Sequence, residues 1–259
     1  LSRYEIQLES ALSELKTVDN LRPFVELNPY REVLSKANEF VGYLPNAETV
    51  EPDTKLGLDD MFELVRKADE DYRTLQEKKE KLKQKIEEYR AKQQIVAPFR
   101  PLECDLHRVL HYRYITYRFG RIAVEFYHKM QKYLMDDLKA IFVEGERDES
   151  YVYGVYFVSQ AETQKVDAVF RSLHFERIEL KDEFEGTPDT AYRVLENEIA
   201  RVNLEIEDLD KQAGEMLADR APQLVAARDR LEELSNNFDV RKLAARMEDK
   251  QEDYYILCG

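Results

Sequence analysis

The chain has 259 residues, of which 43% are apolar and 36% charged, and its net charge is −14. The apolar share suffices to bury a core and argues against a disordered chain. The acidic balance argues against DNA or RNA as the main partner, because phosphate binding needs a local excess of lysine and arginine.

The low glycine content and the lack of long apolar runs narrow the class of protein further. Glycine occurs eight times, about half its usual share, which predicts long helices and few turns. No run of about 18 apolar residues is present, so we expect no membrane-spanning helix. Cys104 and Cys258 give no disulfide framework and suit a reducing cytoplasm. Because the chain begins with Leu1 and shows no signal peptide, we expect it to be a fragment.

Residues 1–58 are predicted to form an N-terminal helix and a joint region. Four prolines interrupt residues 20–58, where we expect loops and a short helix over 30–43. The helix expected over 3–17 carries an apolar stripe made of Tyr4, Leu8, Ala11 and Leu15.

Residues 59–96 are predicted to form the outgoing helix of an antiparallel coiled coil, with Asp59 as N-cap and Pro98 as stop signal. Lys79 stands in the apolar seam, where it either extends its charged end to solvent or fixes the register. The apolar seam positions alternate steps of four and three, which is the heptad pattern: Met61, Val65, Ala68, Tyr72, Leu75, Leu82, Ile86 and Tyr89.

Residues 183–250 are predicted to return as helices along the first arm. Thr187 and Pro188 mark a helix start, and Pro222 should bend or break the helix. From the lengths we pair 59–96 with 188–220, and 3–17 with about 224–247. The end of the chain, 251–259, is predicted to open a strand of a second, truncated lobe. The returning seam consists of Leu195, Ile199, Val202, Ile206, Leu209, Ala213 and Met216.

Residues 97–182, between the two arms, are predicted to form a distal α/β lobe. The expected order is β-α-β-β-α-β, a ferredoxin-like arrangement with helices on one face of the sheet and a free opposite face. The fold class is therefore α+β, mostly helical. The strands are expected at 111–119, 140–146, 151–158 and 175–180, and the helices at 122–139 and 160–173.

No catalytic or cofactor site is predicted in the chain. No two glycines lie closer than nine residues, so neither a dinucleotide-binding nor a phosphate-binding glycine loop is present. No nucleophile motif accompanies the histidines. Cys104, His107 and His111 have helical spacing for zinc, but a fourth ligand is not evident, and we favour surface histidines before a strand.

The aromatic stretch 111–119 carries the candidate partner-binding residues. Strand alternation would place Tyr112, Tyr114 and Arg118 on the open face of the sheet. Tyrosine and arginine are favoured at protein interfaces, and a similar combination is found in RNA-binding sheets. The alternative is ordinary half-buried strand tyrosines.

Several stretches resemble the cytoplasmic half of subunit I of V-type ATP synthases, which is equivalent to subunit a of V-ATPases. APFRPLECDL (97–106) and YRYITYRFGRI (112–122) resemble the start of its distal lobe, with Gly120 ending the strand. Residues 173–202 resemble its passage into the returning helix, although His174 stands where glycine is common. The final YYILCG is similar to the strand that opens the return to the proximal lobe.

The resemblance implies a dumbbell of proximal lobe, coiled-coil bar and distal lobe on the cytoplasmic face of a membrane-bound complex. It implies a static, non-catalytic stator subunit that docks the peripheral-stalk subunits E and G and resists torque. A membrane half with the proton half-channels and an essential arginine would follow outside this chain, as would part of the proximal lobe.

The alternative from another class is a chromosome-organising protein, similar to an SMC-type coiled-coil arm that carries a lobe. The acidic balance and the lack of a basic stripe on the lobe disfavour it. Binding of labelled DNA or RNA at low salt would distinguish the two.

Overall fold

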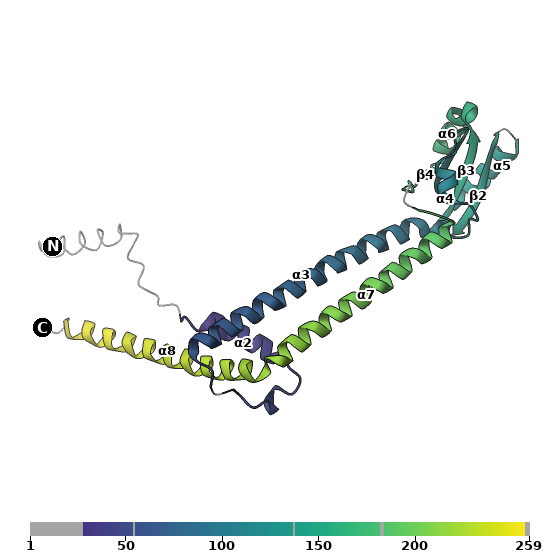
Figure 1. Cartoon of the computed structure of the whole chain (residues 1–259). Helices are drawn as coiled ribbons and strands as arrows, with labels where there is room; N and C mark the ends of the chain where they lie inside the picture. Colours follow the sequence, from purple (N-terminus) through teal and green to yellow (C-terminus); the bar gives the residue numbers. More distant parts are fainter. Residues whose placement is uncertain (1–27, 54, 137, 182–183, 257–259) are drawn as a thin grey trace, which may run out of the picture. The chain divides into compact units, whose positions relative to one another are not determined.

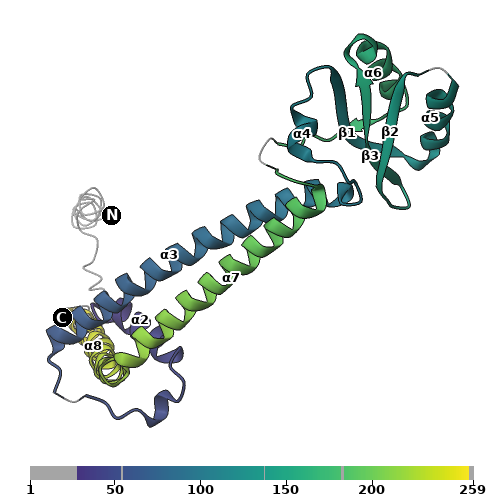
Figure 2. The same ribbon diagram turned by 45° about the vertical axis from the view of Figure 1, so that its right-hand side comes forward.

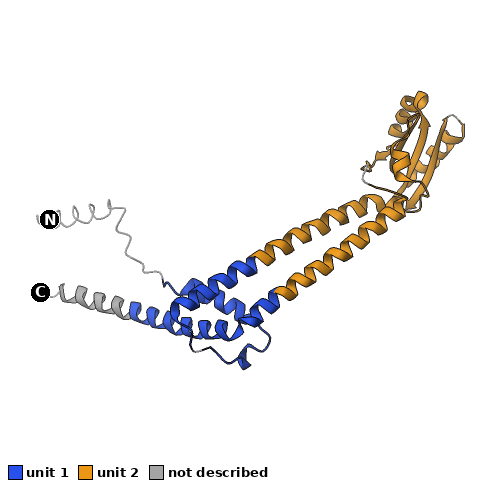
Figure 3. Ribbon diagram, viewed as in Figure 1, with its two compact units in different colours: residues 1–73, 213–259 blue, residues 74–212 orange. Residues whose placement is uncertain are grey.

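The computed structural model describes residues 28–53, 55–136, 138–181 and 184–256. It is mostly helical with one four-stranded antiparallel sheet, as the predicted α+β class requires (Figure 1). The chain divides into two compact units (Figure 3). Unit 1 consists of residues 1–73 and 213–259, and unit 2 of residues 74–212.

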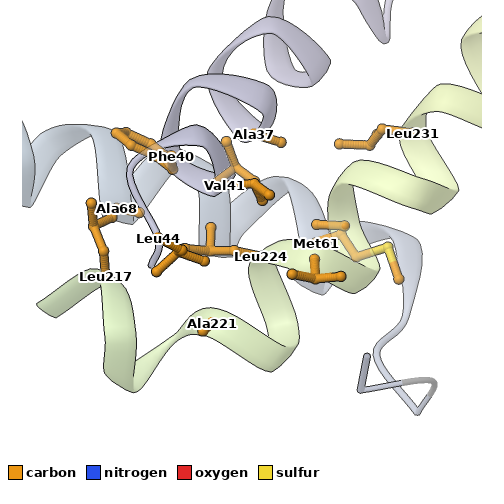
Figure 4. Close-up of a cluster of buried hydrophobic side chains, with 13 residues drawn as sticks. Ala37, Phe40, Val41, Leu44, Met61, Ala68, Leu217, Ala221, Leu224 and Leu231 are labelled. Atoms are coloured by element: carbon orange, nitrogen blue, oxygen red, sulfur yellow. The ribbon is translucent and has the colours of Figure 1, made fainter. Parts of the chain in front are cut away.

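Unit 1 is built from helices α2 (Arg31–Gly42) and α8 (Ala221–Ile256) with the first turns of α3 (Leu58–Val96) and the last turns of α7 (Pro188–Asp219). The short helix predicted over 30–43 corresponds to α2. Apolar side chains of these helices meet in one buried cluster (Figure 4). Its members include Ala37, Phe40, Val41, Leu44, Met61, Val65, Ala68, Leu217, Leu224 and Leu231.

Side-chain hydrogen bonds fasten the start of α2 to α8. Asn28 Nδ2 donates to the backbone oxygen and the hydroxyl of Ser235, at 3.1 and 2.9 Å. Ser235 is a buried polar residue, so these bonds supply the partners that its burial requires. Unit 1 is therefore stabilised both by an apolar core and by hydrogen bonds between Asn28 and Ser235, which lie far apart in the sequence.

The predicted helix break near Pro222 is present, because α7 ends at Asp219 and α8 begins at Ala221. Proline is tolerated in the first turn, where its missing N–H would have no helical acceptor. Arg220 between the helices is held by Asp71 Oδ2 at 2.6 Å.

The prediction of a strand over 251–259 is wrong for residues 251–256, since α8 continues to Ile256. A short apolar run does not by itself distinguish strand from helix. Residues 257–259, and the helix expected over 3–17 with its apolar stripe, lie outside the described residues.

In unit 2, α3 and α7 lie side by side and antiparallel (Figures 1 and 2). Lys79 Nζ contacts Asp210 Oδ1 at 2.5 Å, and Gln93 Nε2 donates to the backbone oxygen of Tyr192 at 3.4 Å. The partner of Lys79 is thus a carboxylate on the facing helix, as expected for a side chain that fixes register. Seam residues Ile86 and Val202 are buried.

After a short α-helix, and leaving 3-10 turns aside, the lobe between these two helices has the element order strand, helix, strand, strand, helix, strand. The sheet order is β2-β3-β1-β4, and each neighbouring pair is antiparallel. The elements are η2 (Ala97–Phe99), α4 (Leu106–Leu110), β1 (Ile115–Ala123), α5 (Val124–Asp136), β2 (Ala140–Arg147), β3 (Tyr151–Ser159), η3 (Gln160–Glu162), α6 (Thr163–Ser172) and β4 (Glu176–Arg177).

Both faces of the sheet carry apolar clusters. Ile122 and Tyr156 pack on one face with residues of α5 and α6. Phe119 and Val155 pack on the other face with Phe99 of η2 and with residues of α4. The prediction of a wholly free face is therefore wrong, because helix α4, which the sequence pattern did not reveal, and η2 cover part of it.

Candidate partner-binding surface

The structure does not place the three residues predicted to share an open face on one face of the sheet, although Tyr112 and Arg118 both line a cavity of about 580 Å³ beside β1. Strand β1 begins only at Ile115, because backbone hydrogen bonds in a turn hold the preceding residues, with Tyr112 N donating to Val109 O at 3.3 Å. Tyr114 is 80% exposed, and Tyr112 is 46% exposed with its ring centroid 6.5 Å from that of Phe157. Arg118 instead lies on the face that α5 and α6 cover. Strand alternation from Tyr112 to Arg118 therefore does not apply.

The remaining uncovered part of the sheet lies on the side opposite α5 and α6, toward the edge strand β2. Ile141 pairs with Phe157, and Val143 pairs with Val155 across the β2–β3 ladder, so these side chains share one face. Ile141 is 67% exposed and Val143 40%. We call this surface the outer apolar face; it consists of Tyr112, Ile115, Ile141, Val143 and Phe157.

Sequence reasoning missed Ile141 and Val143. The available signal was the run AIFVEGE at 140–146, in which Ile141 and Val143 alternate with Phe142. Alternation shows that the two side chains share a face of the sheet. It does not show that α4 and η2 leave this part of the face uncovered. A contiguous group of exposed apolar side chains on a folded lobe indicates an interaction surface.

Arg118 belongs to a charged cluster that joins β1 and β4 to α6. Asp167 of α6 accepts a hydrogen bond from the Tyr156 hydroxyl at 2.7 Å and contacts Arg177 Nη2 at 2.5 Å and Arg118 Nη2 at 3.5 Å. Tyr156 is fully buried, and the side chain of Asp167 is 14% exposed. Arg118 therefore has a structural role within the lobe, because its contact with Asp167 links β1 to α6.

The same cluster shifts two pKa values. Burial raises the pKa of Asp167, but the Tyr156 hydroxyl and the two guanidinium groups outweigh burial, and the net pKa is lowered. Burial, and next the hydrogen bond to Asp167, raise the pKa of Tyr156. The carboxylate therefore stays ionised and the phenol neutral at ordinary pH.

Replacing Asp167 by asparagine is expected to lower the free energy of unfolding by about 2 kcal/mol, because two guanidinium groups lose their carboxylate partner. The folded-state pKa lies below the usual value, so this stabilisation is complete above about pH 4 and is lost as the pH falls through the folded pKa. Urea unfolding at pH 7 and pH 3 measures both effects. Tyr156→Phe, which removes one hydroxyl, is the control and should cost about 1 kcal/mol. An unchanged stability of D167N at pH 7 would contradict the assignment.

Cys104, His107 and His111 do not form a metal centre in the described structure. Within residues 28–53, 55–136, 138–181 and 184–256, no three His, Cys, Asp or Glu side chains are grouped to hold a metal ion. His111 Nδ1 contacts His107 O at 2.7 Å, and burial raises the pKa of the Cys104 thiol.

In the part of the chain that the structure describes, none of the helices combines the length and apolarity needed to span a bilayer.

Comparison with known proteins gives a similarity to solved structures but none to a family model or a curated sequence. Among solved structures, the chain is similar to the crystal structure of the cytoplasmic N-terminal domain of subunit I, homolog of subunit a, of V-ATPase. The identity is 12% and the TM-score 0.42, over 81% of this chain and 70% of that chain. This is the kind of domain that residues 97–122 and 173–202 resemble.

Proposed function

We propose that the chain is the cytoplasmic part of a non-catalytic stator subunit of a rotary V-type ATPase or ATP synthase. The observation that carries the proposal is the order of the matching motifs: the stretch 97–122 leads from the end of α3 into β1, and the stretch 173–202 leads from β4 into α7. The lobe that these motifs flank is inserted between two antiparallel helices, α3 and α7. In this proposal the helix pair is a coiled-coil bar and the lobe is ferredoxin-like.

A stator must resist the torque that a rotor exerts on it, and paired helices suit this task better than a single helix. An isolated helix is marginal in water, because most helical stability comes from packing of an apolar face. Here Ile86 and Val202 are buried in the seam between the two helices, and the Lys79–Asp210 ion pair fixes the relative position of the helices. Sliding of one helix along the other would break this ion pair and expose the seam.

We infer that the lobe docks the peripheral-stalk subunits E and G on its outer apolar face. Apolar and aromatic side chains in the centre of a patch supply most of the binding free energy at protein interfaces. Ile141 and Val143 would form this centre, with Tyr112, whose ring lies near that of Phe157, at its rim. This proposal retains Tyr112 as a partner-binding residue and leaves Arg118 to the Asp167 cluster; Tyr114, which is 80% exposed, stays a prediction.

Titration calorimetry of the whole chain with a purified E–G heterodimer tests the docking proposal. Changing both Ile141 and Val143 to aspartate is expected to weaken binding by about 30-fold or more, because charge replaces the apolar centre. Val240→Asp is the matched control, since Val240 of unit 1 is 66% exposed, like Ile141, and should leave the affinity unchanged. Absence of binding by the unmodified chain at high micromolar concentration, or equal affinity of the double variant, would overturn the proposal.

A further inference from the structure

The cavity of about 580 Å³ beside β1 opens where β4 departs from that strand. In the described ladder, β4 pairs with Gly120 and Arg121, whereas β1 begins at Ile115. Ile178 N still donates to Phe119 O at 2.9 Å, and the residues that follow it line the cavity together with the first half of β1. The cavity is therefore a consequence of the short pairing between β1 and β4.

The lining combines two guanidinium groups with an apolar surface. Arg118 and Arg177 both line the cavity, and the one carboxylate among the described lining residues is that of Glu179. A pocket of this kind fits a ligand with a charged head and an apolar body. The apolar part of the lining is formed by Ile115, Phe119, Ile178 and Leu180.

The guanidinium group of Arg118 is incompletely satisfied. Across the residues that the structure describes, Arg118 Nε is the one buried side-chain nitrogen or oxygen atom without a hydrogen-bond partner. Nη1 donates to Tyr117 O at 2.9 Å, whereas Nη2 lies 3.5 Å from Asp167 Oδ2, beyond the usual length of such a bond. Asp167 is held more closely by Arg177 and by the Tyr156 hydroxyl, at 2.5 and 2.7 Å.

We propose that the cavity binds a carboxylate attached to an apolar group, and that Nε and Nη2 of Arg118 donate to it. These two atoms form the side of a guanidinium group that gives two parallel hydrogen bonds to one carboxylate. The side chain of Arg118 is 31% exposed, so a rotation of its end brings Nε to the cavity. An acceptor there removes the free-energy cost of a buried donor without a partner.

The charges around the cavity favour a carboxylate over a phosphate group. Arg177 is already paired with Asp167, so Arg118 is the cation left to neutralise a ligand, and Glu179 adds a negative charge to the lining. A carboxylate carries one negative charge, whereas a phosphate monoester carries about 1.5 to 2 at pH 7, and Glu179 and Asp167 would repel the additional charge. Two sources carry the proposed chemistry, the C-terminal residue of a peptide and a free carboxylic acid.

Nuclear magnetic resonance of the whole isotope-labelled chain tests the proposal, because the Nε–H group of Arg118 gives a signal of its own. Titration with the peptide N-acetyl-Ala-Ala-Leu is expected to shift this signal until it saturates. The same peptide with a C-terminal amide, and inorganic phosphate, should bind at least about tenfold more weakly. Isocaproate has the apolar group and the carboxylate but no peptide bond. Equal affinity for isocaproate identifies a free acid as the source, and tighter binding of the peptide identifies a C-terminal residue.

Two variants change the affinity in opposite directions. Arg118→Lys keeps the charge but removes the paired donors, and should weaken binding of the peptide by about tenfold or more. Glu179→Gln removes a repelling charge from an exposed side chain and should strengthen binding by about twofold to threefold. Glu125→Gln is the matched control, because this exposed glutamate of α5 does not line the cavity, and it should leave the affinity unchanged.

The proposal does not rest on the stator function, since E–G docking is tested through Ile141 and Val143, which do not line this cavity. Calorimetry of these two variants with E–G and the titrations above can therefore fail independently. Three outcomes of the titrations would overturn the carboxylate site: no saturating shift at millimolar peptide, equal affinity for the acid and the amide, or an affinity that Glu179→Gln leaves unchanged.

Discussion

Replacing Leu224 by alanine is expected to lower the free energy of unfolding of unit 1 by about 3 to 4 kcal/mol. Leu224 of α8 is fully buried among side chains of α2 and α3, including Val41 and Met61 (Figure 4). The substitution removes apolar surface from the core and leaves a cavity. Because three different helices form its walls, the site cannot collapse to fill that cavity without moving a helix.

Hydrogen exchange of the whole chain measures this loss separately for each unit, which matters because a chain with two compact units need not unfold in one step. Protection should fall in α2 and the start of α8, while the sheet of unit 2 keeps its protection. Leu243→Ala is the control, because Leu243 of the same helix is 61% exposed and should cost less than about 0.5 kcal/mol. A similar effect of both substitutions would contradict the proposed core.

Replacing Gly120 by alanine is expected to destabilise the lobe by about 3 kcal/mol. Gly120 of β1 lies directly opposite Gly154 of β3. A Cβ atom at Gly120 would overlap the backbone oxygen of Glu176 and approach Phe175 Cζ to 2.5 Å. A backbone oxygen in the β1–β4 pairing cannot move aside as a flexible side chain can, so the added methyl group should separate β4 from the sheet.

Gly214→Ala is the matched control for this prediction, and we expect it to stabilise the chain rather than to destabilise it. Nothing lies within 4 Å of a Cβ atom at Gly214, which stands inside α7. Alanine there should stabilise the chain by up to about 1 kcal/mol, because it has the higher helix propensity and restricts the unfolded chain. Urea unfolding followed by far-ultraviolet circular dichroism compares the two variants. A neutral G120A variant would show that the close approach of β4 to β1 is not maintained in solution.

Local patterns in the sequence determined the types of the main elements. The heptad steps from Met61 onward predicted α3, and Thr187 with Pro188 predicted the start of α7, because periodicity and helix-start signals act within one or two turns. The break near Pro222 follows from proline chemistry alone. The four strands were likewise placed by their aromatic and β-branched residues, although β4 is limited to Glu176–Arg177.

Only the tertiary structure decided which surfaces remain exposed. Strand alternation predicts an open-face position for Arg118, yet its partner Asp167 lies 49 residues away in α6, and no local pattern reports such a contact. Ile141 and Val143 are exposed because α4 and η2 cover the sheet only in part. Side-chain alternation along a strand defines two faces from the sequence, but burial of either face depends on segments distant in the chain that pack against it.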